Sequence, residues 1–101
     1  MLGDDHVSNQ QVVQRIVEIV NEAGMHARPA AELVKLAGRF RCEIRLEKDG
    51  LEVNGKSIMG VLMLAAEHGS RLRISASGDD AVDAVTALSD LVGCGFGEME
   101  A

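Results

Sequence analysis

The alternation of hydrophobic and polar positions marks the middle of the chain as a β-hairpin. Residues 42–47 (CEIRLE) alternate strictly between apolar and charged side chains, which is the period of a strand with one buried face. Asp49 and Gly50 are typical of a tight hairpin turn, and the returning strand begins with the apolar Leu51. Residues 71–76 (RLRISA) show the same alternation and predict a further strand.

A first strand is predicted near the start of the chain. Residues 14–20 (QRIVEIV) have the length of a strand and are rich in β-branched side chains, but their alternation is imperfect. Such a pattern is expected where a strand is buried on much of both sides, or where it lies centrally in its sheet. We therefore interpret this segment as a strand that is either buried on much of both sides or central.

Three segments show the apolar spacing of amphipathic helices. Apolar residues stand at relative positions 0, 3, 4 and 7 from Ala30, which form one face of a helix, and His26 occupies the cap position directly before it. A second helix is predicted over residues 58–67, with Ser57 as its N-cap. A third is predicted over residues 79–93, with an aspartate at its cap and a glycine at its end.

The resulting element order is β-α-β-β-α-β-α, without an internal repeat. Three amphipathic helices and four half-buried strands bury their apolar faces best in two layers, so we predict an α+β fold. In this open-faced β-sandwich the three helices cover one face of a four-stranded antiparallel sheet and the other face is solvated. We expect residues 1–11 to be a flexible N-terminal tail, residues 12–93 to be the folded domain, and residues 94–101 to be a short C-terminal tail.

Composition and charge narrow the class of protein. The chain has 101 residues, 47% of them hydrophobic, which suits one globular domain, and its two aromatic residues imply an aliphatic core. The net charge of −6 and the shortage of aromatics argue against nucleic-acid binding. Residues 26–56 nevertheless carry seven Lys/Arg against five Asp/Glu, whereas the remainder carries three against eleven. A locally basic surface of this kind suits a small anion or an acidic protein partner.

Several other classes of site find no support in the sequence. No apolar run reaches the length of a membrane span, and the N-terminal residues carry two acids, so we expect a cytoplasmic protein without direct membrane binding. Cys42 and Cys94 stand alone without a CxxC pattern, which favours two unpaired thiols over a disulfide or a metal site. His6 and His68 add no ligand spacing, and we predict neither a metal nor a cofactor.

The strongest chemical signal is the sequence GMHARPAA at residues 24–31, which contains the only proline of the chain. The first N–H groups of a helix have no internal acceptor, so they form a ready anion site. Proline is tolerated in a first turn, and Arg28 adds a charge that can bind phosphate oxygens. The alternative is that His26 is only a polar residue at a convenient helix start. The combination with Arg28 and the helix register favours a site that accepts a phosphoryl group on His26.

Two stretches of the sequence resemble a known family. GMHARPAAELVKLAGRF and NGKSIMGVLMLAAEHGS are similar to the corresponding motifs of the histidine-containing phosphocarrier proteins (HPr) of the bacterial phosphoenolpyruvate-dependent sugar phosphotransferase system. The resemblance covers roughly residues 13–92 and implies the same two-layer fold. It also implies a monomeric carrier without enzymatic turnover. Enzyme I would phosphorylate Nδ1 of His26, with Arg28 and the amides of Ala27 and Arg28 as phosphate ligands, and IIA components of sugar permeases would receive the phosphoryl group.

The second motif adds a regulatory expectation. Ser57 would be a helix cap on the residue pattern alone, contributing about 1 kcal/mol. The resemblance implies that HPr kinase/phosphorylase phosphorylates this serine, and that Ile58 and Met59 are exposed contacts for partner proteins. Residues 61, 62 and 65 would face the sheet instead. The chain departs from the family in its longer N-terminus and in the sequence LMLAAEHGS, which puts partner preference in doubt.

A different class of function stays open at this stage. The chain could be a regulatory binding module, such as a serine-phosphorylated coregulator, or a nitrogen-branch phosphocarrier, in either case without a role in sugar uptake. The intact His26-Ala27-Arg28-Pro29 sequence favours carrier chemistry, because a purely serine-regulated protein could dispense with the histidine.

Overall fold

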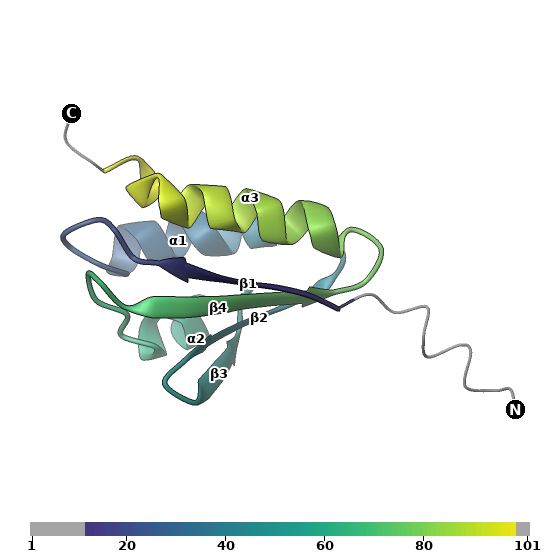
Figure 1. The fold of residues 1–101 in the computed structure, drawn as a ribbon, viewed down its shortest axis with the longest axis horizontal. Helices are drawn as coiled ribbons and strands as arrows, with labels where there is room; N and C mark the ends of the chain where they lie inside the picture. The colour runs from purple at the N-terminus through teal and green to yellow at the C-terminus, as the bar shows by residue number, and fades with distance from the viewer. Residues whose placement is uncertain (1–11, 99–101) are drawn as a thin grey trace, which may run out of the picture.

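Four antiparallel strands form one sheet in the computed structural model, which describes residues 12–98 (Figure 1). The prediction of a flexible tail at residues 1–11 lies outside the described residues. The spatial order of the strands is β1-β4-β2-β3, so β4 and β2 are the central strands. In chain order the elements are β1 (Val12–Glu18), α1 (Ala27–Ala37), β2 (Glu43–Lys48), β3 (Leu51–Asn54), α2 (Ile58–Met63), β4 (Arg71–Ser77), α3 (Ala81–Gly93) and the 3₁₀ turn η2 (Gly95–Gly97).

The predicted element order and the two-layer architecture are confirmed. Helices α1 and α3 run side by side over one face of the sheet, and α2 packs near β3 and the start of α1 (Figure 1). The hairpin turn is where the sequence predicts it, with Asp49 and Gly50 both in the left-handed region. The open face carries the predicted charged side chains, including an ion pair of 3.1 Å between Arg73 and Glu47 on the central strands.

The interpretation of the first strand as buried on much of both sides or central is wrong. β1 lies at the edge of the sheet and pairs only with β4, from Val12 opposite Ser77 to Glu18 opposite Arg71. Its imperfect alternation has another origin: Val13 and Val17 pack against the core, whereas Val12 and Ile16 are more than half exposed on the uncovered face. An apolar residue on the open face produces the same letter pattern as a residue buried on that face.

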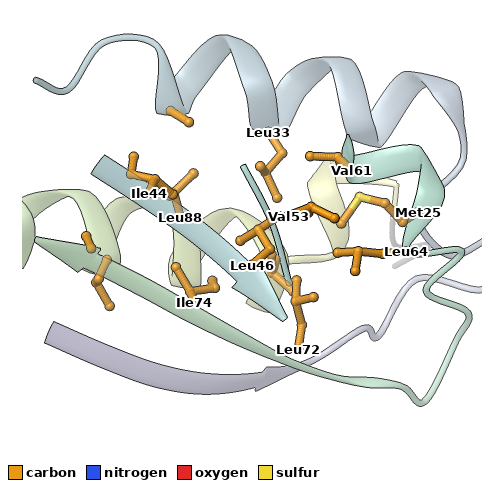
Figure 2. Close-up of a cluster of buried hydrophobic side chains, with 14 of the residues drawn as sticks. Met25, Leu33, Ile44, Leu46, Val53, Val61, Leu64, Leu72, Ile74 and Leu88 are labelled. Atoms are coloured by element: carbon orange, nitrogen blue, oxygen red, sulfur yellow. The ribbon is translucent and has the colours of Figure 1, made fainter. Parts of the chain in front are cut away.

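The core lies between the helices and the inner face of the sheet (Figure 2). Ile44 and Leu46 from β2 and Leu72 and Ile74 from β4 are fully buried, which matches the strict alternation of those strands. The helices contribute Leu33, Val61, Val85, Leu88 and Val92, all without exposed surface. Apart from Phe96 at the C-terminal end, the buried cluster is aliphatic or sulfur-containing, as the composition predicts.

Helix α2 is shorter than predicted, ending at Met63 rather than near Glu67. Ala65 has a φ of +49°, which is incompatible with a right-handed helix, so the chain turns there. The next residue, Ala66, accepts a hydrogen bond of 2.8 Å from the backbone N–H of Met25, which ties this turn to the loop before α1. The prediction that residues 61, 62 and 65 face the sheet is therefore correct only for Val61. Leu64 is buried in place of the other two.

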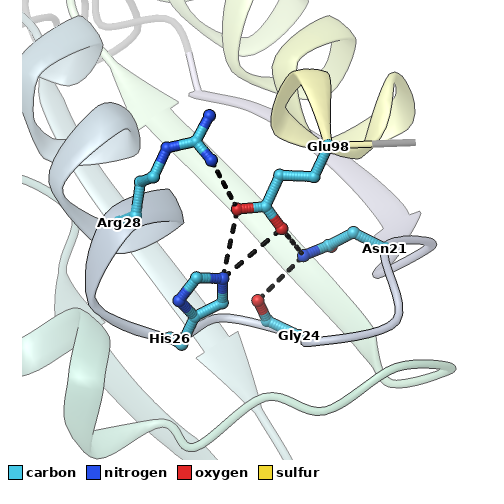
Figure 3. Close-up of polar contacts among 5 residues, drawn as sticks. All are labelled: Asn21, Gly24, His26, Arg28 and Glu98. Carbon is cyan, nitrogen blue, oxygen red and sulfur yellow. Dashed lines mark hydrogen bonds and ion pairs between the residues drawn. The ribbon is translucent and has the colours of Figure 1, made fainter. Parts of the chain in front are cut away.

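The C-terminal residues 94–98, predicted to belong to a short tail, instead form part of the folded structure. After α3 the chain makes the turn η2, in which Phe96 adopts a φ of +58° and is only 5% exposed. Burying this aromatic side chain removes a large apolar area from water, which ties the turn to the core. The turn places Glu98 beside the start of α1 (Figure 3).

Candidate functional site

His26 stands at the N-cap of α1, in an extended backbone conformation, and its side chain makes no cap hydrogen bond. The carbonyl of His26 accepts the first helical bond, from the N–H of Ala30 at 3.0 Å. Pro29 has no N–H, and no backbone acceptor among residues 12–98 receives the N–H of Ala27 or Arg28. Two amide donors at the positive end of an eleven-residue helix are thus available to an anion.

The loop before the helix fixes where His26 stands. Gly24 has a φ of +72°, and a Cβ at this position would come within 2.8 Å of the carbonyl oxygen of Ala66. Only glycine allows this close approach, and it lets the next residue, the buried Met25, bond to the same carbonyl. His26 is therefore anchored through its neighbour to the segment that follows α2.

Glu98 contacts both predicted phosphate-site side chains (Figure 3). Its Oε2 atom lies 3.1 Å from Nε2 of His26 and 3.1 Å from a guanidinium nitrogen of Arg28. Its Oε1 atom accepts a hydrogen bond of 3.0 Å from the side-chain amide of Asn21, which also donates to the carbonyl of Gly24. His26 and Arg28 remain substantially exposed, with 42% and 64% of their side-chain surface accessible, whereas Glu98 is only 15% accessible.

These contacts keep Glu98 ionised. Partial burial on its own would raise the pKa of this carboxyl, but the hydrogen bonds from Asn21 and His26 and the charge of Arg28 lower the pKa below its ordinary value. Asn21 is itself buried, and its Oδ1 atom has no partner among the described residues. The amide is thus oriented by its two donor contacts, one of which is to Glu98.

The second predicted site lies at the start of α2. Ser57 is the N-cap there, and its hydroxyl accepts the N–H of Gly60 at 3.1 Å, so the predicted cap is confirmed. Ile58 and Met59 are 38% and 68% exposed, as predicted. Leu62 and Met63 extend the exposed apolar surface along the same helix.

Other kinds of chemistry find little support in residues 12–98. The structure brings together no group of three or more side chains that could hold a metal ion there. Within the same range, no helix has the length and apolarity needed to cross a bilayer. Cys42 is buried and Cys94 exposed, both as free thiols. Burial and the adjacent carboxylate of Asp80 raise the pKa of Cys42 to about 11, so this thiol is not a nucleophile near neutral pH.

The sequence indicated His26, Arg28 and Ser57 as candidate site residues, but not Glu98 and Asn21, which the structure places at the same site as His26 and Arg28. The carboxylate is separated from His26 by 72 positions and follows a glycine-rich stretch without helical or strand periodicity. The one available signal was the aromatic residue between two glycines, which could have indicated a packed turn. Asn21 looked like an ordinary turn residue, and its burial depends on the tertiary arrangement.

Comparison with known proteins agrees with this geometry. The family model described as "PTS HPr component phosphorylation site" matches residues 13–93. A phosphocarrier protein HPr of Cupriavidus necator is 43% identical over 89 residues, which are 88% of this chain and all of that protein. A crystal structure of HPr from Thermoanaerobacter tengcongensis matches with a TM-score of 0.84 and 44% identity, covering 87% of this chain and 99% of that one.

A further similar structure carries a different name. The solution structure of Crh, the Bacillus subtilis catabolite repression HPr, is 44% identical and has a TM-score of 0.61, covering 79% of this chain and 95% of that one. The matched family model, the sequence identity over most of the chain and the shared fold all support one assignment. The chain belongs to the HPr family of phosphocarrier proteins of the phosphotransferase system.

Proposed function

We propose that phosphorylated enzyme I transfers a phosphoryl group to Nδ1 of His26, and that the chain passes this group to IIA components of sugar permeases. The observation that carries the proposal is the position of His26 at a helix start without a side-chain cap, where the amides of Ala27 and Arg28 have no backbone acceptor. Its Nε2 atom contacts Glu98, and Nδ1 carries no contact to the residues drawn in Figure 3.

The transfer would proceed by attack of the Nδ1 lone pair on phosphorus. The bond from phosphorus to the histidine of enzyme I breaks as the new P–N bond forms, and the electron pair returns to the donor imidazole. The transferred oxygens carry negative charge, which the N–H groups of Ala27 and Arg28 at the helix start and the guanidinium of Arg28 would stabilise. A clamp of one arginine and one helix end is moderate, which suits a group that must be passed on.

Partner docking is proposed for the apolar surface on α2. Ile58 and Met59 are exposed and follow directly on Ser57, so a protein bound there would desolvate the serine. Phosphorylation of Ser57 by HPr kinase/phosphorylase would bring a charge of about −1.5 to −2 into that interface. Because a negative charge at a helix N-terminus is locally favourable, the modification would oppose docking without unfolding α2.

The proposal is tested by incubating the protein with enzyme I and labelled phosphoenolpyruvate. We expect one labelled site, loss of the label in acid as for phosphohistidine, and no labelling of His26→Ala. His68→Ala is the matched control, since His68 is an exposed histidine outside the site, and it should label normally. Undiminished labelling of His26→Ala would overturn the assignment.

A second candidate function is a regulatory module read by a partner according to its phosphorylation state. The similarity to Crh favours keeping this candidate. The intact histidine and its helix-end site distinguish the two, because a module regulated only through its serine has no use for them. Transfer of label from the phosphorylated chain to a IIA component would favour the carrier, whereas labelling without onward transfer would favour the regulatory module.

A further inference from the structure

Glu98 contacts the edge of the His26 ring that carries Nε2, the nitrogen that the proposed phosphoryl transfer does not use. Its carboxylate reaches Nε2 through contacts of 3.1 and 3.4 Å, although the two residues lie 72 positions apart in the chain. The carboxylate has little accessible surface and is held from two further sides, by Asn21 and by Arg28. It is therefore fixed in place by its surroundings, while the imidazole is the exposed partner.

We propose that Glu98 is a positioning residue that keeps a proton on Nε2 of His26, so that Nδ1 presents its lone pair to the incoming phosphoryl group. This inference rests on the proposed function. A neutral imidazole has one N–H donor and one acceptor nitrogen, and a carboxylate can only accept. The ring nitrogen that faces Glu98 must then be the protonated one, and the other nitrogen is left as the nucleophile.

The same contact acts during the transfer. When Nδ1 forms its bond to phosphorus, the ring gains positive charge and its Nε2 proton becomes more acidic. A carboxylate at Nε2 stabilises that charge, and it does so from the side of the ring opposite the phosphoryl group. The proton stays on Nε2 throughout, so that when the phosphoryl group leaves for the next acceptor, the released ring is again neutral with a free Nδ1. No proton has to be exchanged with solvent.

The placement of Glu98 depends on Phe96 and Asn21. Phe96 is buried with a left-handed backbone and anchors the turn that ends at Glu98. The Nδ2 group of Asn21 donates hydrogen bonds to both the Gly24 carbonyl and Oε1 of Glu98, whereas its Oδ1 has no partner among residues 12–98. The amide thereby joins the His26 loop to the carboxylate that faces the ring.

The tautomer can be observed directly in the full chain by ¹⁵N–¹H NMR of the imidazole. In the unphosphorylated protein, at about pH 8.5 where model imidazoles are neutral, we expect an N–H on Nε2 and a lone-pair nitrogen at Nδ1. Glu98→Ala should move both ¹⁵N shifts toward the average of exchanging tautomers, and Glu98→Gln, which retains a neutral acceptor, should lie between. Glu22→Gln removes an exposed carboxylate from the same loop and should leave the spectrum unchanged.

The kinetic expectation is a loss of about tenfold in kcat/KM for phosphorylation of Glu98→Ala by enzyme I, with a smaller loss for Glu98→Gln. This is the low end for a charge-assisted hydrogen bond, because the histidine is partly exposed. A proton found on Nδ1 in the wild type, or identical imidazole spectra for the wild type and Glu98→Ala, would overturn the inference. Faster transfer in Glu98→Ala would overturn it too, by showing that the carboxylate obstructs the phosphoryl group.

The outcome for Glu98 is separable from that for the proposed function. If His26→Ala still accepts label, the proposed function fails whatever the spectra show. If His26 is the labelled residue but its tautomer and its transfer rate do not respond to Glu98, only the positioning role fails. Circular dichroism and Tm of each variant exclude a general loss of structure as the cause.

Discussion

The starts of α1 and α2 are built alike in backbone and differently in side chain. Both N-cap residues, His26 and Ser57, have extended conformations. Ser57 accepts the N–H of Gly60 with its hydroxyl, so the second helix satisfies part of its own terminus. His26 provides no such acceptor, and its ring is held by Glu98 instead. Among residues 12–98, each start has two amides without an acceptor, those of Ala27 and Arg28 in α1 and those of Ile58 and Met59 in α2. The two starts therefore differ in the side-chain cap, which only α2 has, and in the imidazole and guanidinium that stand at α1.

The difference also separates the two proposed phosphorylations. A phosphoryl group at His26 would meet donors that have no protein partner. At Ser57 it would be attached to an oxygen that already accepts a hydrogen bond, so the modification reinforces a contact that exists. The P–N bond of a phosphohistidine is also much more labile than the phosphate ester of a phosphoserine. We therefore expect the first modification to be readily transferred, and the second to act as a stable mark.

Among the three helix starts, removing one amide at the start of α1 should have the largest effect. Ala27→Pro deletes a single N–H, and proline is favoured at the first helical position after an extended residue such as His26. We expect kcat/KM for phosphorylation by enzyme I to fall by about tenfold or more, since a hydrogen bond to a charged group contributes roughly 1.5–3 kcal/mol. Tm should change little. Ala27→Gly keeps the N–H and is the control; wild-type kinetics in Ala27→Pro would show that this amide does not bind the phosphoryl group.

Substitutions of Ser57 at the start of α2 should have smaller effects, and the main effect of removing the cap should be on stability. Ser57→Ala removes the cap and should cost about 1 kcal/mol in the free energy of unfolding, measured by urea denaturation. Ser57→Asp can replace the cap, so its stability should stay near that of the wild type, while phosphorylation of His26 by enzyme I becomes slower. If enzyme I phosphorylates both variants at the wild-type rate, Ser57 has only a capping role.

A substitution at the start of α3 should have the smallest effect, limited to stability and its dependence on pH. Asp80 stands at the N-cap position of α3, but its side chain makes no hydrogen bond to that helix. Its carboxylate instead accepts hydrogen bonds from the backbone N–H groups of Arg41 and Cys42, which join α3 to the segment before β2. The hydrogen bond from Arg41 is the main reason why the pKa of Asp80 is lowered. Since the pKa is lower in the folded than in the unfolded state, the ionised carboxylate stabilises the fold above the unfolded pKa. This contribution is lost as the pH falls through the folded pKa.

Asp80→Asn should accordingly lower Tm near neutral pH and make Tm less dependent on pH below about pH 5, where the wild-type carboxylate becomes protonated. Asp79→Asn, in which the neighbouring exposed carboxylate is removed, should behave like the wild type. Both variants should accept phosphate normally, because neither side chain contacts the His26 site. Parallel Tm–pH curves for Asp80→Asn and the wild type would contradict the role given to this carboxylate.

Local periodicity was sufficient to predict most of the fold. The strict alternation in β2 and β4 and the turn at Asp49 and Gly50 depend on interactions within a few residues, and all three are as predicted. The place of β1 at the edge is decided by pairing with a strand far along the chain, which periodicity does not encode. The early end of α2 likewise depends on a hydrogen bond from Met25, outside the helix itself.

Only the part of the candidate site that is contiguous in sequence could be predicted. His26, Ala27, Arg28 and the helix start are adjacent in sequence, so their chemistry can be inferred from their order. Glu98 comes from the opposite end of the described chain, after a turn whose position depends on burial of Phe96. Nothing in the spacing of the residues indicates that this carboxylate meets the histidine ring.

The pairing of β1 with β4 also has a consequence for biosynthesis. Val12 is opposite Ser77, so the first strand made cannot find its partner until most of the chain has left the ribosome. The loop that carries His26 follows β1, and the carboxylate at residue 98 emerges later still. We therefore expect nascent chains to remain poor phosphoryl acceptors until the last turn has packed. Unfinished chains would then not accept phosphoryl groups from enzyme I.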